Sequence, residues 1–193
     1  MNEILNNNFK QELIVIASRP NNGKMALLTK ITKDCTKLGK KVLLISVDEP
    51  KDKIIPRVRT EFPENLIVED SVIKDLTVIE QYLNKHKPDV VIIDYLQLLP
   101  DGDETIITLK NLSNTKNIPI IVTSQLSRKC IDLDLSTISL DEIVSTAKSF
   151  KTIVKEADVF TILYHKSEKE YMVRELKNSY KEVKETDIRD ILN

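Results

Sequence analysis

The segment from Ser18 to Met25 contains the residue types of a phosphate-binding loop. It reads Ser-Arg-Pro-Asn-Asn-Gly-Lys-Met, follows an apolar run and precedes an amphipathic stretch. A turn between a strand and a helix directs backbone N–H groups at phosphate oxygens, a glycine lets the chain approach them, and a lysine reaches the outer phosphates. Gly23 and Lys24 supply these two residues. The candidate binding residues of this loop are Arg19, Asn21, Asn22, Gly23, Lys24 and Met25.

Two positions of the loop depart from the pattern G-x-x-x-x-G-K-[ST]. Ser18 stands at the first glycine position, and Met25 replaces the Ser or Thr whose hydroxyl ligates magnesium. The second change matters more, because a thioether is a poor ligand for a hard cation such as Mg²⁺. We expect weak binding of ATP or ADP through the loop backbone and Lys24, with little gain from Mg²⁺. An ordinary helix N-terminus after a strand is the alternative.

A second candidate residue, Asp94, follows the apolar run Val90–Ile93. A strand that ends in aspartate places a carboxylate at the carboxyl edge of the sheet, where α/β folds bind ligands. In phosphate-loop ATPases an aspartate at this place helps to hold Mg²⁺. Asp94 is therefore the candidate metal-binding residue, and a helix-capping aspartate at a strand end is the alternative.

The elements that must position these residues alternate along the chain. Uninterrupted apolar runs are typical of strands covered on both faces, and the charged stretches between them have helical periodicity. This alternation predicts a doubly wound α/β domain with a mostly parallel sheet. The predicted strands are Leu13–Ala17, Val42–Val47, Leu66–Val68, Val90–Ile93, Ile118–Thr123 and Val159–Tyr164. The predicted helices are Lys24–Leu38, Lys51–Glu61, Asp75–Lys87 and Glu104–Lys116.

Local signals complete this outline of the chain. Gly39 is expected just after a helix, and Gly102 in a turn. The stretch from Lys129 to Val144 has few periodic signals and is expected to form a long surface loop. The charged tail, residues 177–193, is expected to form a peripheral helix beside a core of about residues 10–180. We expect residues 1–193 to form a single domain.

Composition excludes several classes of protein. The 193 residues carry 29 Lys and Arg against 30 Asp and Glu, so the net charge of −1 gives no evidence for a nucleic-acid binder. Cys35 and Cys130 have neither disulfide-scaffold nor zinc-site spacing, which favours reduced thiols. No apolar run reaches the roughly 18 residues of a membrane span. We expect a cytoplasmic protein that does not bind membranes.

Three segments of the chain resemble the DnaB-type replicative helicases. They are Arg19-Pro20-Asn21-Asn22-Gly23-Lys24, Ile93-Asp94-Tyr95-Leu96-Gln97-Leu98-Leu99 and Thr123-Ser124-Gln125-Leu126-Ser127-Arg128, and Ala157–Tyr164 resembles the family's late strand. The resemblance implies a RecA-like P-loop NTPase fold, with a central mostly parallel sheet and helices on both faces. It also implies ATP bound between neighbouring subunits of a ring that moves on single-stranded DNA. Gln125 matches the family residue that senses the nucleotide.

The resemblance also implies changes in the catalytic residues. Asp48 takes the place of the family's glutamate base, one methylene shorter, whereas Glu49 is expected to point off the other side of an extended chain. The catalytic candidates are therefore Asp48, Glu49 and Gln125. Lys177 matches the lysine of the family's finger segment, but Ser179 stands at the arginine position. Arg174 is an alternative finger residue, although its spacing is unfavourable.

The expected partners follow from the loops and from the chain's extent. The family's DNA-binding loops are basic. Here residues 100–104 and 128–135 contain several acidic side chains, and Asp141 and Glu142 add two more nearby. These acidic side chains would oppose single-stranded DNA, and Lys148 is the main remaining cation. Because the first strand is expected near Leu13, we expect the family's N-terminal collar domain and linker helix to be absent. We therefore expect no stable hexameric ring from this chain alone.

Three functions fit these residues. The first is a degenerate helicase paralogue that binds nucleotide, hydrolyses it poorly and acts through a replicative helicase or another replication protein. The second is an active ATPase that uses Asp48 or Glu49 together with a finger from a partner. The third is a protein-interaction scaffold that binds no nucleotide, with Lys24 as a surface residue.

Overall fold

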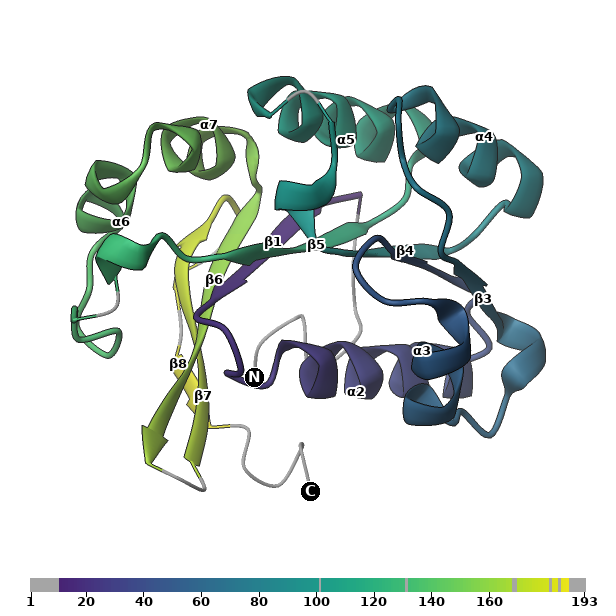
Figure 1. Ribbon diagram of the computed structural model, residues 1–193, viewed down its shortest axis with the longest axis horizontal. Coiled ribbons are helices and arrows are strands. Elements are labelled where there is room, and N and C mark those ends of the chain that lie inside the picture. Colours follow the sequence, from purple (N-terminus) through teal and green to yellow (C-terminus); the bar gives the residue numbers. More distant parts are fainter. Residues whose placement is uncertain are drawn as a thin grey trace.

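The computed structural model describes residues 11–100, 102–130, 132–167, 170–180, 182–183 and 185–187. Its sheet has eight strands in the order β3-β2-β4-β5-β1-β6-β7-β8. The strands from β3 to β6 are parallel, and β7 and β8 add an antiparallel edge (Figure 1). Their bounds are β1 Leu13–Ser18, β2 Val42–Ser46, β3 Leu66–Glu69, β4 Val90–Asp94, β5 Ile120–Gln125, β6 Val159–Ser167, β7 Glu170–Asn178 and β8 Glu185–Asp187.

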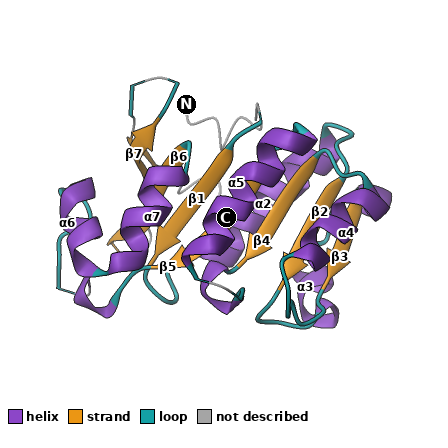
Figure 2. Cartoon of the chain, turned by 90° about the horizontal axis from the view of Figure 1, so that it is seen from above, coloured by secondary structure: helices purple, strands orange, loops and turns teal. Residues whose placement is uncertain are grey.

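Helices cover both faces of this sheet, which confirms the predicted fold class. One face carries α2 and α3, and the other carries α4, α5 and α7 (Figure 1), while Figure 2 shows α6 and α7 beside the edge that holds β6 and β7. The helices are α2 Lys24–Lys37, α3 Lys51–Val58, α4 Thr77–His86, α5 Asp103–Lys116, α6 Leu140–Thr146 and α7 Lys148–Glu156.

Alternate residues of the central strands build two separate hydrophobic cores. In β1, Leu13 and Val15 pack in the core under α4, α5 and α7, whereas Ile14 and Ile16 pack in the core under α2 and α3. Every residue of β1 and β2 is buried. Strands buried on both faces need continuous apolar side chains, which explains why the uninterrupted runs identified them.

The ends of the helices agree with the local signals at some places and differ at others. The predicted helix end at Gly39 is confirmed: Gly39 has a φ of 75° and its N–H donates to Thr36 O. By contrast, α3 ends at Val58, three residues before the predicted end. Pro56 cannot donate a helical hydrogen bond, and Arg59 adopts a left-handed conformation with a φ of 37°.

The predicted surface loop from Lys129 to Val144 is only partly correct. A short 3₁₀ turn, Arg128–Cys130, opens it, and helix α6 begins at Leu140. Ser139 starts α6 with a capping box to Glu142, and this S-x-x-E signal is visible in the sequence. Leu135 and Ile138 are buried in the core, so the segment packs inward.

The tail does not form the expected helix in the part that the structure describes. Residues 170–178 complete β7, and Glu185–Asp187 form β8. Residues 181, 184 and 188–193 of the tail lie outside the described residues. Asp101, in the acidic segment of residues 100–104, also lies outside them. Within the described ranges, no helix is long and apolar enough to cross a membrane.

Candidate functional site

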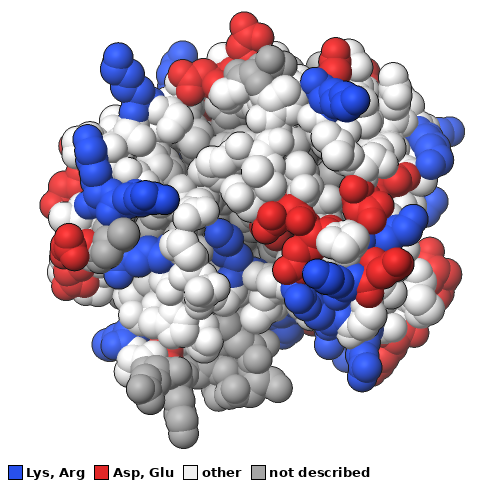
Figure 3. All heavy atoms as spheres, in the orientation of Figure 1, with Lys and Arg blue, Asp and Glu red and all other residues white. Residues whose placement is uncertain are grey.

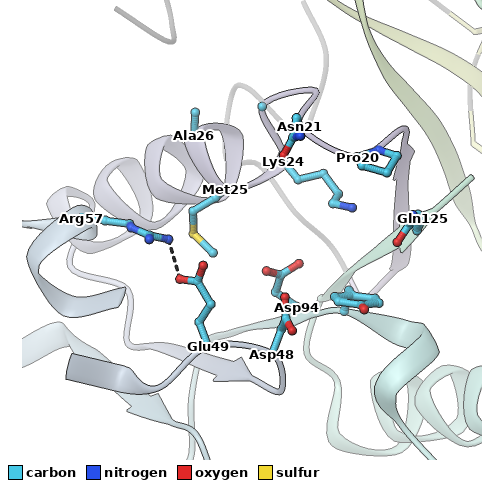
Figure 4. A pocket seen from close by; sticks show the side chains of 12 residues that line it. Pro20, Asn21, Lys24, Met25, Ala26, Asp48, Glu49, Arg57, Asp94 and Gln125 are labelled. Carbon is cyan, nitrogen blue, oxygen red and sulfur yellow. Dashed lines mark hydrogen bonds and ion pairs between the residues drawn. The ribbon is translucent and has the colours of Figure 1, made fainter. Parts of the chain in front are cut away.

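A cleft of about 430 Å³ opens where β1, β2, β4 and β5 end. Its size lies in the range of ordinary ligand-binding pockets. It forms at the carboxyl edge of the sheet, where α/β folds bind ligands (Figure 4). Its lining consists of Pro20, Asn21, Gly23, Lys24, Met25, Ala26, Asp48, Glu49, Arg57, Asp94, Tyr95 and Gln125.

The loop before α2 forms one wall of the cleft. Ser18 ends β1 as a buried residue whose hydroxyl donates to the Arg19 carbonyl at 2.9 Å. Gly23 is the N-cap of α2 and has a φ of 82°, a conformation that favours glycine. The first turn of α2 contains no acidic residue. The positive end of the α2 dipole at the cleft is therefore not neutralised by an acidic residue of its own first turn. This favours the binding of an anion there.

Lys24 and Asp94 bring opposite charges to the base of the cleft. Lys24 Nζ lies 5.5 Å from the centroid of the Tyr95 ring. Burial lowers the pKa of Lys24, and the nearby Asp94 and Asp48 carboxylates oppose part of this effect. Burial raises the pKa of Asp94, against the hydroxyl donated by Thr123 and the charge of Lys24. An anion bound here would favour the charged form of Lys24.

The structure contradicts the expected orientation of Glu49. Asp48 and Glu49 both line the cleft and face its interior (Figure 4). The expectation assumed an extended chain, but β2 ends at Ser46 and the next residues bend. Ser46 Oγ donates to the Glu49 carbonyl at 2.5 Å and accepts from its N–H at 3.3 Å. This turn brings both carboxylates to the same side.

Four lining residues were missed from the sequence: Pro20, Ala26, Arg57 and Tyr95. Arg57 is the most consequential, because its Nη1 lies 2.5 Å from Glu49 Oε2 and forms an ion pair with it. Pro20 and Tyr95 adjoin residues that the motifs did identify, so sequence proximity could have found them. Arg57 lies eight positions after Glu49 on α3, and no local pattern marks it.

Gln125 enters the cleft from the end of β5 and is held through its backbone by Gln97. The Gln97 side chain accepts from Gln125 N at 3.1 Å and donates to Gln125 O at 3.0 Å. It also donates to Ser124 Oγ at 2.8 Å. These contacts join two of the segments that carried the family resemblance, residues 93–99 and 123–128.

Two predicted loop residues lie apart from the described lining of the cleft. The Arg19 guanidinium turns to a different surface hollow, where Nη2 donates to Cys130 O at 2.6 Å and to Leu133 O at 2.5 Å. Asn22 belongs to the same turn, but only its neighbours Asn21 and Gly23 line the cleft. That Arg19 and Asn22 bind a ligand stays a prediction, and the groups concerned are their backbone N–H groups.

The two finger candidates make contacts within this chain. Lys177 Nζ donates to three carbonyls at the end of α7: Val154 O at 2.8 Å, Lys155 O at 2.9 Å and Ala157 O at 2.6 Å. Arg174 Nη1 donates to Ile138 O at 2.9 Å. Within this chain Lys177 is thus a helix-capping cation, and its finger role stays a prediction.

The acidic residues of the candidate DNA-binding loops have local structural roles. Asp103 and Glu104 lie in the first turn of α5, where the helix dipole favours them. Asp134 accepts from Ser136 N at 2.9 Å, and Glu142 completes the cap of α6. Lys148 begins α7 and is exposed. That these acidic residues oppose the binding of single-stranded DNA stays a prediction.

One residue of the lining, Met25, suits Mg²⁺ poorly as a ligand. Met25 directs a thioether into the cleft (Figure 4), and sulfur is a soft ligand. Among the described residues, no group of three or more His, Cys, Asp or Glu side chains is arranged to hold a metal ion. Asp94 remains the one predicted metal residue, and its carboxylate accepts the Thr123 hydroxyl. Cys35 and Cys130, both buried thiols, lie outside the lining.

Comparisons with known proteins agree with this architecture. One solved structure, described as an ATPase domain, has a TM-score of 0.77 and 20% identity, and the match covers 96% of this chain and 84% of that one. A second, described as "The Structure Of A DnaB-Like Replicative Helicase And Its Interactions With Primase", has a TM-score of 0.74 and 19% identity, with 92% of this chain covered. This chain spans only 54% of that second chain. The fold is therefore that of RecA-like helicase ATPase domains.

The family assignment comes from a sequence comparison. No curated protein matches the chain. A family model described as "DnaB-like helicase C terminal domain" matches residues 63–189, more than half of the 193 residues. The match begins after the Gly23–Lys24 loop and includes Asp94 and Gln125. This chain therefore belongs to the family of DnaB-like helicase C-terminal domains.

Proposed function

We propose that this chain binds ATP or ADP in the cleft, hydrolyses it poorly and acts through a replicative helicase or another replication protein. The observation that carries nucleotide binding is the convergence of the N-terminus of α2, Lys24 and Asp94 on one cleft. A helix N-terminus and a lysine are complementary to phosphates, and the cleft has the volume of a ligand site.

Three features support impaired hydrolysis. Met25 offers no hydroxyl to Mg²⁺, and Asp48 is shorter than the glutamate that the family uses to orient water. A base displaced by about 1 Å costs on the order of a hundredfold in rate. Lys177 is bound to the end of α7, and Ser179 cannot supply an arginine's charge. The three features affect three different parts of catalysis, namely metal binding, water orientation and stabilisation of transition-state charge.

One observation favours the second candidate function, an active ATPase of altered chemistry. Asp48 and Glu49 both face the cleft, so two carboxylates are available near a bound phosphate chain. Activity would then require the cation of a partner. The third candidate, a scaffold that binds no nucleotide, predicts that Lys24 has no role.

Calorimetry with ATP, with and without Mg²⁺, tests nucleotide binding and separates these functions. We expect measurable binding that Lys24→Ala abolishes, and unchanged binding in the control Lys33→Ala, which removes an exposed lysine from the same helix. Turnover near a helicase's own rate would favour the active enzyme. Unmeasurable binding at millimolar ATP would favour the scaffold.

The role of Met25 can be tested by restoring a hydroxyl. Mg²⁺ is expected to strengthen ATP binding to Met25→Thr but not to the wild type, because only the variant offers a hydroxyl ligand at position 25. Met25→Leu, an apolar substitution of similar size, serves as the control and should behave like the wild type. Equal Mg²⁺ dependence in all three proteins would show that residue 25 does not set it.

The partner is tested by adding the chain to a DnaB-type helicase and measuring unwinding and ATP hydrolysis. One similar structure is described with its interactions with primase, so primase is a further partner to include. We expect a change in helicase activity that depends on the concentration of this chain. Unchanged activity together with no complex by gel filtration would contradict a role through these partners.

A further inference from the structure

The ion pair between Glu49 and Arg57 lies at one side of the cleft, next to Met25 (Figure 4). Arg57 comes from α3 and Glu49 from the turn after β2, and Ser46 fixes the backbone of that turn. The two charged groups lie 2.5 Å apart, with side-chain exposures of 49% for Arg57 and 33% for Glu49. Such partly exposed pairs are weak and can exchange partners.

The charges that line the cleft do not balance in favour of an anion. Two cations, Lys24 and Arg57, face three carboxylates, those of Asp48, Glu49 and Asp94. The Lys24 ammonium is attracted to the carboxylates of Asp94 and Asp48, and this attraction opposes the lowering of the Lys24 pKa by burial. Arg57 forms an ion pair with Glu49. Figure 3 shows acidic and basic atoms close together over and beside α3. An entering phosphate chain therefore finds both cations already engaged.

We propose that Glu49 is a built-in competitor for the anionic ligand: its carboxylate holds Arg57 until a nucleotide phosphate takes its place. This rests on the proposed nucleotide binding and adds a residue that sets its strength. Arg57 becomes the second cationic contact of the phosphates, across the cleft from the N-terminus of α2. A guanidinium suits this exchange, because its planar fork binds carboxylate and phosphate oxygens alike.

The exchange predicts that removing the competing carboxylate strengthens binding. Glu49→Gln keeps the size of the side chain but frees Arg57, so we expect ATP to bind about three- to tenfold more tightly than to the wild type. The gain is expected to vanish in the double variant Glu49→Gln/Arg57→Gln, because no guanidinium is left to free. Arg57→Gln alone is expected to weaken binding.

Two controls separate this exchange from general charge effects. Asp52→Asn removes the same charge from an exposed position on α3, outside the described lining of the cleft, and is expected to change affinity far less. Inorganic tripolyphosphate is expected to respond to Glu49→Gln as ATP does, because the exchange concerns phosphate oxygens. A response to ATP alone would overturn the assignment of Arg57 to the phosphates.

The outcomes also distinguish this inference from the proposed function. If the wild type binds ATP through Lys24 but Glu49→Gln binds no more tightly, the competitor is refuted and nucleotide binding stands. If Glu49→Gln gains equally with and without Arg57, repulsion alone is responsible and the exchange is refuted. If no variant binds at millimolar ATP, both proposals fail. Circular dichroism of every variant confirms that each protein is folded.

Discussion

Burial makes the proposed role of Lys24 in nucleotide binding dependent on pH. Its pKa is lowered, so part of the population loses the ammonium charge at a lower pH than an exposed lysine would. Phosphates favour the ammonium form and raise this pKa in the complex, so binding takes up protons. The affinity for ATP is therefore expected to fall as pH rises through the lowered pKa of Lys24, by at most about tenfold per pH unit.

Titration calorimetry over an alkaline pH series, above the last phosphate ionisation and up to the ordinary pKa of lysine, measures this fall. Lys24→Arg is the matched control, because a guanidinium stays charged over the whole range. Its affinity is expected to be flatter with pH than that of the wild type. An equally steep decline in both proteins would assign the pH dependence to another group.

At the scale of single elements, Lys177 stabilises α7. Its ammonium binds three carbonyls that the end of the helix leaves without intrahelical partners. Burial lowers the pKa of Lys177, so desolvation offsets part of the gain from these bonds. Lys177→Met keeps the apolar stem and removes the donors, and is expected to lower the free energy of unfolding by about 1–2 kcal/mol.

Urea denaturation measures this loss, with Lys151→Met as the control, because Lys151 is exposed on the same helix. The control is expected to change stability by no more than about 0.5 kcal/mol. A stable Lys177→Met variant that alters a partner's ATP hydrolysis would instead support the finger role implied by the resemblance.

The sequence predicted the elements whose signals are local. The buried parallel strands and the four helices between them follow from continuous apolar runs and helical periodicity. Helix α6 was missed although Ser139 and Glu142 form a recognisable capping box. β7 was missed because its burial is partial and mixed, as is typical of a strand near the edge of a sheet.

The sequence predicted only those parts of the candidate site that local motifs mark. Motifs identified Gly23 and Lys24, at the start of α2, and Asp94, at the end of β4. Arg57 and the inward turn of Glu49 depend on how the chain bends after β2 and on where α3 packs. The position of Arg57 results from the packing of α3, and the bend at Glu49 results from local hydrogen bonds to Ser46 that the extended-chain prediction did not include.

For the whole molecule, the cleft depends on how β1 is anchored between its neighbours. Asp158, just before β6, accepts from Leu13 N at 2.8 Å, and its own N–H donates to Leu13 O at 2.9 Å. The same carboxylate binds Lys110 of α5 at 2.5 Å. One residue thus joins the start of β1, the start of β6 and a helix on the sheet's face. This arrangement fixes the strand that carries the Gly23–Lys24 loop.

Breaking this pair is expected to destabilise the whole domain. The two side chains are only 19% and 10% exposed, so Lys110→Met leaves a nearly buried carboxylate without its cation. Because the Leu13 N–H still supports Asp158, we expect a loss near the lower end of such cases, about 2–3 kcal/mol in the free energy of unfolding. Lys116→Met is the matched control on α5, since its pair with Glu80 is more exposed and is worth about 1 kcal/mol or less. In urea denaturation, Lys110→Met/Asp158→Asn is expected to recover part of the loss, because no uncompensated charge remains. Equal effects of Lys110→Met and Lys116→Met would show that the buried pair does not anchor β1.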